Sequence, residues 1–213
     1  HSYVSARLVE NGRNHIFVDE IQTIADFRLA IRSLALDENN DIYITGSNSR
    51  MFSGDLANEL GGRYVEFKIF SLSYPEFLLF HKLENSDSSL EKYIHFGGLP
   101  YLANLPLEES VVMEYVRSVY STIVLRDVVQ RRNIRNTIFL EQLIKFLADN
   151  VGSLFSAKRI SDFLKNQKVN IASNQVSEYV GALVEAFAIH RVERYDIVGK
   201  RLFERGEITI FLA

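Results

Sequence analysis

Strand-like and helix-like patterns of apolar residues alternate in the first third of the chain. Strand-like segments lie at residues 16–18 (IFV) and 41–47 (DIYITGS), and apolar residues recur at helical spacing from Ile24 to Leu36. A strand, a helix and a second strand form a βαβ unit, which favours parallel strands with a right-handed crossover. A helix around residues 53–60 and a third strand at residues 63–70 (RYVEFKIF) are predicted to follow.

The middle of the chain is predicted to be helical. Ser73 and Glu76 have the spacing of a capping box, and so do Ser88 and Glu91. Each pair therefore predicts the start of a helix. Two further helices are predicted by amphipathic patterns over residues 112–123 and 137–149.

The last third of the chain predicts two helices followed by two strands. Ser156 is the expected N-cap of the first helix, whose inward-facing residues are Ile160, Phe163 and Leu164. The second helix is predicted from the helical spacing of Val176, Val180 and Leu183. Residues 188–204 (AIHRVERYDIVGKRLFE) have the pattern of two strands about a turn at Gly199. This order of elements is typical of a winged helix-turn-helix.

The predicted fold class is therefore α/β followed by mostly α. The expected domains are residues 1–72, with the parallel strands, residues 73–135, which are helical, and residues 136–213, which are winged-helix-like. The composition, 47% hydrophobic and 24% charged, argues against global disorder. The absence of cysteine excludes disulfides and thiolate metal sites and fits a cytoplasmic location. Charged residues interrupt every long apolar run, so no membrane span is expected.

An acidic pair follows the first predicted strand directly, in the stretch HIFVDEIQ at residues 15–22. Apolar strand followed by Asp-Glu is the Walker B arrangement of nucleotide hydrolases. In it, Asp19 would hold Mg²⁺ through a water molecule, and Glu20 would polarise the attacking water. The alternative is a solvated acidic pair at the end of a strand.

Small polar residues end the second predicted strand, where a sensor of the γ-phosphate or of the attacking water would lie. Ser47 and Asn48 are the candidates, although an ordinary polar turn has the same composition. Arg63 follows two glycines and could reach a phosphate as an arginine finger. It could equally pair with Glu66 in the same predicted strand.

Two observations limit what this chain could bind. None of its eleven glycines begins the phosphate-binding motif G-x-x-x-x-G-K-[ST]. The formal net charge of −3 gives no overall attraction to nucleic acid, so DNA binding would need a local basic face. The second helix of the predicted winged helix contains no Lys or Arg. The basic candidates for phosphate contacts are instead Lys158, Arg159, Lys165, Lys168, Lys200 and Arg201.

Several motifs together resemble a family of bacterial and archaeal AAA-type P-loop ATPases. The similar blocks are IFVDEIQ, YITGSNSRMFSGDLANELGGRYVEFKIFSLSYPEFL, FGGLPYL, STIVLRDVVQRRNIR and FLADNVGSLFSAKRISDFLK. The resemblance implies a partial parallel-sheet ATPase core followed by a helical region with a winged helix. It also implies roles for Asp19 as the magnesium ligand, Glu20 as the base, Ser47 and Asn48 as the sensor, and Arg63 at the phosphate site or at a subunit contact.

The resemblance implies further that the phosphate-binding loop lies upstream of this segment. We therefore expect ATP and Mg²⁺ to bind to the intact protein and not to this fragment alone. The alternatives are a DNA-binding winged-helix module and a nucleotide-free protein-interaction module. A sheet edge left open by a missing strand would favour a homo-oligomer.

Overall fold

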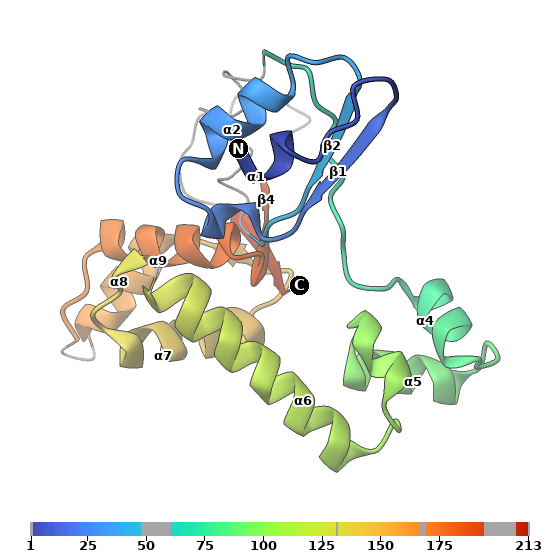
Figure 1. The fold of residues 1–213 in the computed structure, drawn as a ribbon. Coiled ribbons are helices and arrows are strands. Elements are labelled where there is room, and N and C mark those ends of the chain that lie inside the picture. Colours follow the sequence, from blue (N-terminus) through green and yellow to red (C-terminus); the bar gives the residue numbers. More distant parts are fainter. Residues whose placement is uncertain (1, 48–60, 131, 167–168, 194–207, 213) are drawn as a thin grey trace, which may run out of the picture. The chain divides into compact units, whose positions relative to one another are not determined.

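The computed structural model describes residues 2–47, 61–130, 132–166, 169–193 and 208–212. It divides the chain into two compact units, His1–Phe67 and Lys68–Ala213, which we describe separately (Figure 1). The elements of the first unit are α1 (Ser2–Ser5), β1 (Asn14–Val18), the 3-10 helix η1 (Ile21–Thr23), α2 (Phe27–Leu34) and β2 (Asn40–Ile44).

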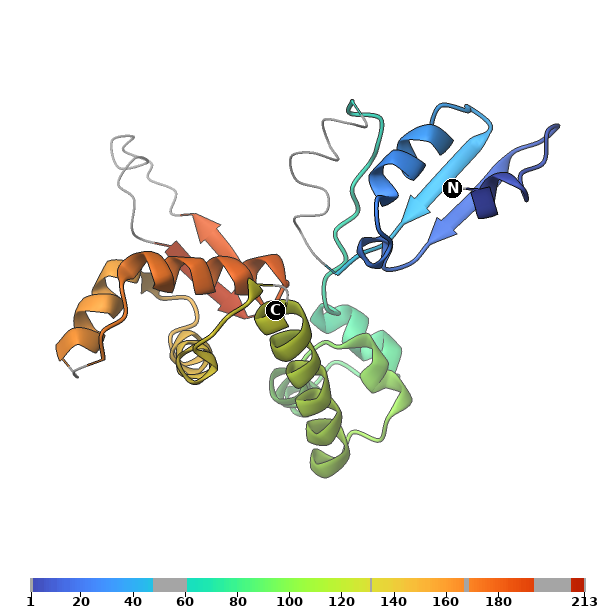
Figure 2. The ribbon, with the colours of Figure 1, turned by 60° about the vertical axis from the view of Figure 1, so that its left-hand side comes forward.

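The first unit is built on two parallel strands, as the βαβ pattern predicts. β1 pairs with β2 in a register that places Asn14 beside Asn40 and Val18 beside Ile44. Side chains alternate across the pair, so Ile16 is buried while its neighbour Phe17 is 75% exposed. The buried face packs around Ile21 and Ile31, with help from partly buried residues Val18, Phe27, Ile42 and Ile44. Figures 1 and 2 show α2 beside the two strands.

The third predicted strand, residues 63–70, has no regular secondary structure and does not join a sheet in the described part of the chain. Its apolar side chains are solvent-exposed, with Phe67 at 81% and Ile69 at 89%. The alternating pattern suits a strand, but a strand also needs a neighbour to receive its backbone hydrogen bonds. The predicted helix at residues 53–60 lies outside the described residues.

The second unit is mostly helical. Its elements are α4 (Tyr74–His81), α5 (Asp87–Phe96), the 3-10 helix η3 (Pro100–Asn104), α6 (Glu109–Thr122), the π-helix η4 (Ile123–Gln130), α7 (Thr137–Asp149), β3 (Leu154–Phe155), α8 (Ala157–Asn166), α9 (Ser173–Glu185), β4 (Ile189–Glu193) and β5 (Ile208–Leu212). The three strands form an antiparallel sheet in the order β3-β5-β4. β4 therefore pairs with residues 208–212, and the predicted turn at Gly199 lies outside the described residues.

One of the two predicted capping boxes is confirmed. The backbone N–H of Ser73 donates to Glu76 Oε2 over 2.8 Å at the start of α4. The prediction at Ser88 is wrong, because α5 begins earlier with Ser86 as its N-cap, accepting from the backbone N–H of Ser89. The hydroxyl of Tyr74 lies beside this cap, 3.0 Å from Asn85 Oδ1 and 3.2 Å from the carbonyl oxygen of Ser86.

The core of the second unit lies between α7, α8, α9, η4 and β4. Its most deeply buried side chains include Leu140, Leu143, Val176, Leu183 and Ile189. On α8, Ile160 is buried as predicted, but Phe163 is 55% exposed. The buried face of α8 instead includes Ser161, whose hydroxyl donates to the carbonyl of Ile171 over 2.6 Å. Within the described residues, no helix has the length and apolar character needed to cross a membrane.

Candidate functional site

The carboxyl ends of β1 and β2 meet at one edge of the parallel pair. Because Val18 lies beside Ile44, the next residue along each strand, Asp19 and Thr45, also come together. The backbone continues this match, since the N–H of Thr45 donates to the carbonyl of Val18 over 3.0 Å. Clefts beyond the carboxyl ends of parallel strands are where α/β proteins commonly bind ligands. This edge is therefore the candidate functional site.

Thr45 links both acidic residues. Its hydroxyl donates a hydrogen bond to Asp19 Oδ1 and accepts one from the backbone N–H of Glu20, at 3.2 Å. Its carbonyl accepts from the backbone N–H of Ile21 at 3.1 Å. One residue at the end of β2 thus fixes the chain at three successive positions after β1.

Glu20 has a left-handed backbone conformation, with φ 48° and ψ 48°. A side chain with a Cβ atom makes this conformation unfavourable by about 1–2 kcal/mol. Local contacts hold it in place, because the carbonyl of Glu20 accepts hydrogen bonds from the backbone N–H and the hydroxyl of Thr23, at 2.9 and 2.8 Å. Such strain is common where a site needs a particular side-chain direction.

The carboxylate of Glu20 is half-buried and accepts two hydrogen bonds on Oε2. One comes from Gln22 Nε2 and the other from Ser47 Oγ, at 3.3 Å. Gln22 Nε2 also lies 3.3 Å from Ser47 Oγ, which closes a triangle of three side chains. Asp19, in contrast, is solvent-exposed next to this triangle.

The donor set suits a hard cation. Two carboxylates and two hydroxyls offer only oxygen atoms, which Mg²⁺ prefers as ligands. Among the described residues no cluster of three or more His, Asp or Glu could hold a metal ion. Mg²⁺ does not need such a cage, because it commonly binds one or two carboxylates and completes its shell with water and substrate phosphates. Asp19 and Glu20 are therefore the residues at this edge that could hold Mg²⁺.

The structure brings together some of the residues that the sequence singled out. Asp19, Glu20 and Ser47 meet at the same edge, whereas Asn48 lies outside the described residues. Arg63 follows Gly61 and Gly62 and is exposed, and among the described residues it contacts neither Glu66 nor the acidic pair. Its assignment therefore stays a prediction.

Sequence reasoning missed Thr45 and Gln22. The signal for Thr45 is its place directly after β2, matching the place of Asp19 directly after β1. Gln22 gives no signal by spacing alone, because only the left-handed turn at Glu20 brings its amide beside the carboxylate.

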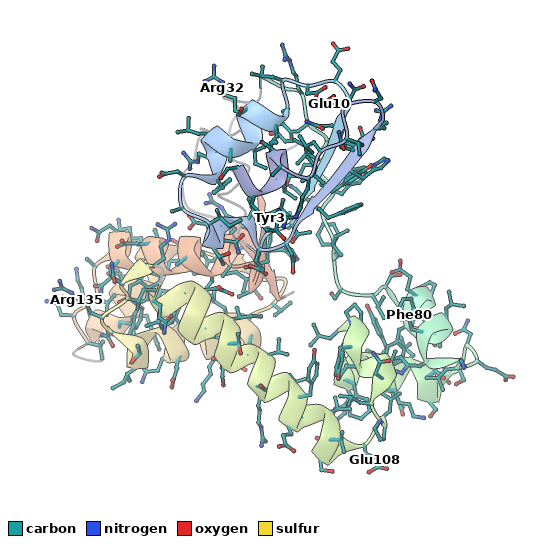
Figure 3. All side chains as sticks on the ribbon, viewed as in Figure 1. Tyr3, Glu10, Arg32, Phe80, Glu108 and Arg135 are labelled. Carbon is teal, nitrogen blue, oxygen red and sulfur yellow. The ribbon has the colours of Figure 1, made fainter. Side chains whose placement is uncertain are left out.

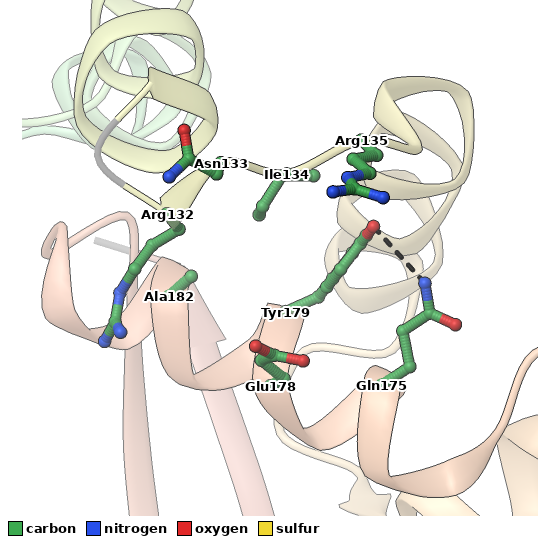
Figure 4. Close-up of a pocket in the computed structure, with 8 residues that line it drawn as sticks. All are labelled: Arg132, Asn133, Ile134, Arg135, Gln175, Glu178, Tyr179 and Ala182. Atoms are coloured by element: carbon green, nitrogen blue, oxygen red, sulfur yellow. Dashed lines mark hydrogen bonds between the residues drawn. The ribbon is translucent and has the colours of Figure 1, made fainter.

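A second, separate feature is a small cavity in the second unit (Figure 4). Its volume is about 180 Å³, and it is lined by Arg132, Asn133, Ile134, Arg135, Gln175, Glu178, Tyr179 and Ala182. The hydroxyl of Tyr179 accepts from Gln175 Nε2 at 3.5 Å and from the backbone N–H of Asn136 at 3.4 Å. An ion pair between Arg132 and Glu185 also joins α9 to the segment before α7. One face of α9 is therefore occupied by contacts inside this unit.

Comparisons with known proteins divide the chain into an N-terminal and a C-terminal match, and the division lies near the boundary between the two structural units. Residues 2–78 match the sequence profile of a family described as AAA domain, and residues 87–205 match one described as Domain of unknown function (DUF8612). An uncharacterised protein of Haemophilus influenzae is 36% identical over 192 residues, which cover 87% of this chain and 47% of the relative. An uncharacterised protein of Methanocaldococcus jannaschii is 28% identical over 205 residues, covering 91% of this chain and 46% of the relative. The chain thus spans about half the length of these relatives.

Proposed function

We propose that this chain, which belongs to the DUF8612 family by the match over residues 87–205, is part of an ATP-hydrolysing AAA-type protein. The match of residues 2–78 to a AAA domain supports an ATPase-like function. The observation that carries the proposal is the meeting of Asp19, Glu20 and Ser47 at the carboxyl edge of a parallel strand pair. All three residues lie inside the AAA match.

The proposed roles follow from the position of each side chain. Asp19, with its exposed carboxylate, would hold Mg²⁺ through water, and the ion would neutralise charge on the phosphates. Glu20 would accept a proton from the attacking water as the water oxygen bonds to the γ-phosphorus. The bond from that phosphorus to the bridging oxygen breaks, which leaves ADP and inorganic phosphate. Ser47 and Asn48 would orient the water or the γ-phosphate, and Arg63 would contact a phosphate or a neighbouring subunit.

The phosphate-binding loop of such an ATPase has no counterpart in these 213 residues. The proposed activity therefore belongs to the complete gene product, and the relatives, about twice as long as this chain, are consistent with that view. Experiments on turnover accordingly use the complete gene product.

Substitution of Glu20 tests the proposal. In Glu20→Gln, loss of the general base should lower ATP hydrolysis by roughly 10²- to 10⁴-fold while ATP binding is retained. The matched control is Glu10→Gln, since Glu10 is an exposed glutamate of the same unit (Figure 3). Phosphate release and ATP binding would be measured on both variants. Unchanged turnover in Glu20→Gln, or an equal loss in the control, would contradict the assignment.

A second candidate function is contact with DNA by the second unit. The order α7, β3, α8, α9, β4, β5, with an antiparallel sheet of β3, β5 and β4, resembles the order expected of a winged helix, and this resemblance supports the candidate. Lys158 and Lys165 are exposed seven residues apart on α8 and can reach phosphates. The face of α9 that lines the cavity beside Tyr179 makes contacts within this unit, so it is less available for binding DNA than α8 is. Binding of this chain to duplex DNA that weakens with added salt would support the candidate, and indifference to DNA would exclude it.

A further inference from the structure

We infer that Gln22 is a positioning residue for Glu20, which holds the carboxylate in the orientation needed to accept a proton from water. The inference rests on the proposed function of Glu20 as a general base. It starts from two contacts of one amide group, because Gln22 Nε2 donates to Glu20 Oε2 and also lies 3.3 Å from Ser47 Oγ.

The backbone explains how Gln22 reaches Glu20. Glu20, in its left-handed conformation, is the N-cap of η1, and the side chains of residues 20 and 22 meet at this turn. Ile21, between them, is only 2% exposed and belongs to the buried cluster of the first unit. Its burial anchors η1 in the core. Gln22 therefore approaches the carboxylate from a fixed element and not from a loose loop.

The orientation of the Gln22 amide is determined by its surroundings. Its Oε1 atom is buried and has no hydrogen-bond donor among the described residues. A buried acceptor without a donor is unfavourable, so a rotated amide would be expected if rotation could satisfy it. Rotation would instead place Oε1 against the carboxylate oxygen of Glu20, which is also an acceptor. The amide therefore keeps the orientation in which its N–H groups donate to Glu20 and Ser47.

These contacts define which oxygen of Glu20 is free to react. Oε2 is held by Gln22 and Ser47, whereas Oε1 accepts no hydrogen bond from the described residues. A carboxylate fixed through one oxygen presents the other in a single direction, which is what proton transfer from a positioned water requires. Gln22 therefore acts through Glu20 without touching the reacting atoms.

Two variants of similar shape test this role in the complete gene product. Gln22→Met removes both polar groups, and Gln22→Glu replaces the two N–H donors with acceptors. We expect kcat to fall roughly 10- to 100-fold in each while KM for ATP changes little, because misorientation of a catalytic group affects the reaction and not substrate binding. The control is Gln142→Met, which changes an exposed glutamine on α7. Failure of both Gln22 variants to fold would overturn the inference by giving Gln22 a structural role.

A double variant separates this inference from the proposal on which it rests. If Gln22 acts only through Glu20, then Glu20→Gln with Gln22→Met will be no slower than Glu20→Gln alone. Additive losses, or normal kcat in Gln22→Met, would overturn the role of Gln22 while leaving Glu20 as the base. Normal turnover in Glu20→Gln would instead refute the proposed function itself.

Discussion

At the scale of single residues, the candidate site depends on hydrogen bonds that only the folded chain creates. Asp19, Glu20 and Ser47 could be predicted, because acidic residues after an apolar strand and small polar residues after its neighbour are a pattern in the sequence. Thr45 and Gln22 could not be predicted in the same way. The role of Thr45 follows from strand register, and that of Gln22 follows from one left-handed residue.

Thr45 offers a residue-scale prediction. Thr45→Val keeps the shape of the side chain but removes the hydroxyl that donates to Asp19 and accepts from the N–H of Glu20. We expect the free energy of unfolding of this chain in urea to fall by about 1–3 kcal/mol, because two hydrogen bonds are lost and each contributes about 0.5–1.5 kcal/mol. Thr45→Ser keeps the hydroxyl and should lose less. Equal stability of the Val and Ser variants would show that the hydroxyl does not hold the site.

At the scale of elements, helical periodicity and the strand–helix–strand order predict the structure well, whereas alternation of apolar residues alone does not predict a paired strand. The helix over residues 137–149 and the parallel pairing of the first two strands are confirmed. The prediction of a strand at residues 63–70 is wrong in the described part of the chain. Alternation of apolar residues favours a strand, but it does not provide the neighbouring strand with which to pair. The sequence pattern predicts that Phe163 faces inward, but its side chain is exposed because the buried face of α8 includes Ser161 instead.

Gly98 gives a prediction about how the segment before α4 is attached. The backbone N–H of Leu72 donates to the carbonyl of Gly98 over 2.7 Å, and a Cβ atom at Gly98 would lie 2.3 Å from the carbonyl oxygen of Leu72. Gly98→Ala should therefore force the two backbones apart and destabilise the chain by about 1–3 kcal/mol.

The matched control for this prediction is Gly181→Ala in α9. A Cβ atom at Gly181 would meet no atom within 4 Å, and alanine favours a helix over glycine by about 1 kcal/mol. Thermal unfolding of both variants should show opposite shifts of the midpoint. Equal shifts in the same direction would mean that the close approach of Gly98 to Leu72 does not matter for stability.

At the scale of the whole molecule, two sequence families and two structural units divide the chain in a similar way. The AAA match covers residues 2–78 and therefore contains the candidate site, while the DUF8612 match covers residues 87–205 in the second unit. None of the eleven glycines begins the motif G-x-x-x-x-G-K-[ST], so an ATPase built on this edge would need a phosphate-binding loop from outside these 213 residues. We propose that Asp19 and Glu20, at the carboxyl edge of β1 and β2, bind the metal ion of that ATPase.

Binding of Mn²⁺ with ATP tests that claim most directly, because Mn²⁺ takes oxygen ligands like Mg²⁺ and is visible by electron paramagnetic resonance. The complete gene product would be compared with Asp19→Asn and with Asp26→Asn, a change at an exposed aspartate of the same unit. We predict that Asp19→Asn weakens Mn²⁺ binding in the presence of ATP by roughly 10- to 100-fold, while Asp26→Asn binds like the unaltered protein. Unchanged Mn²⁺ affinity in Asp19→Asn would contradict the account.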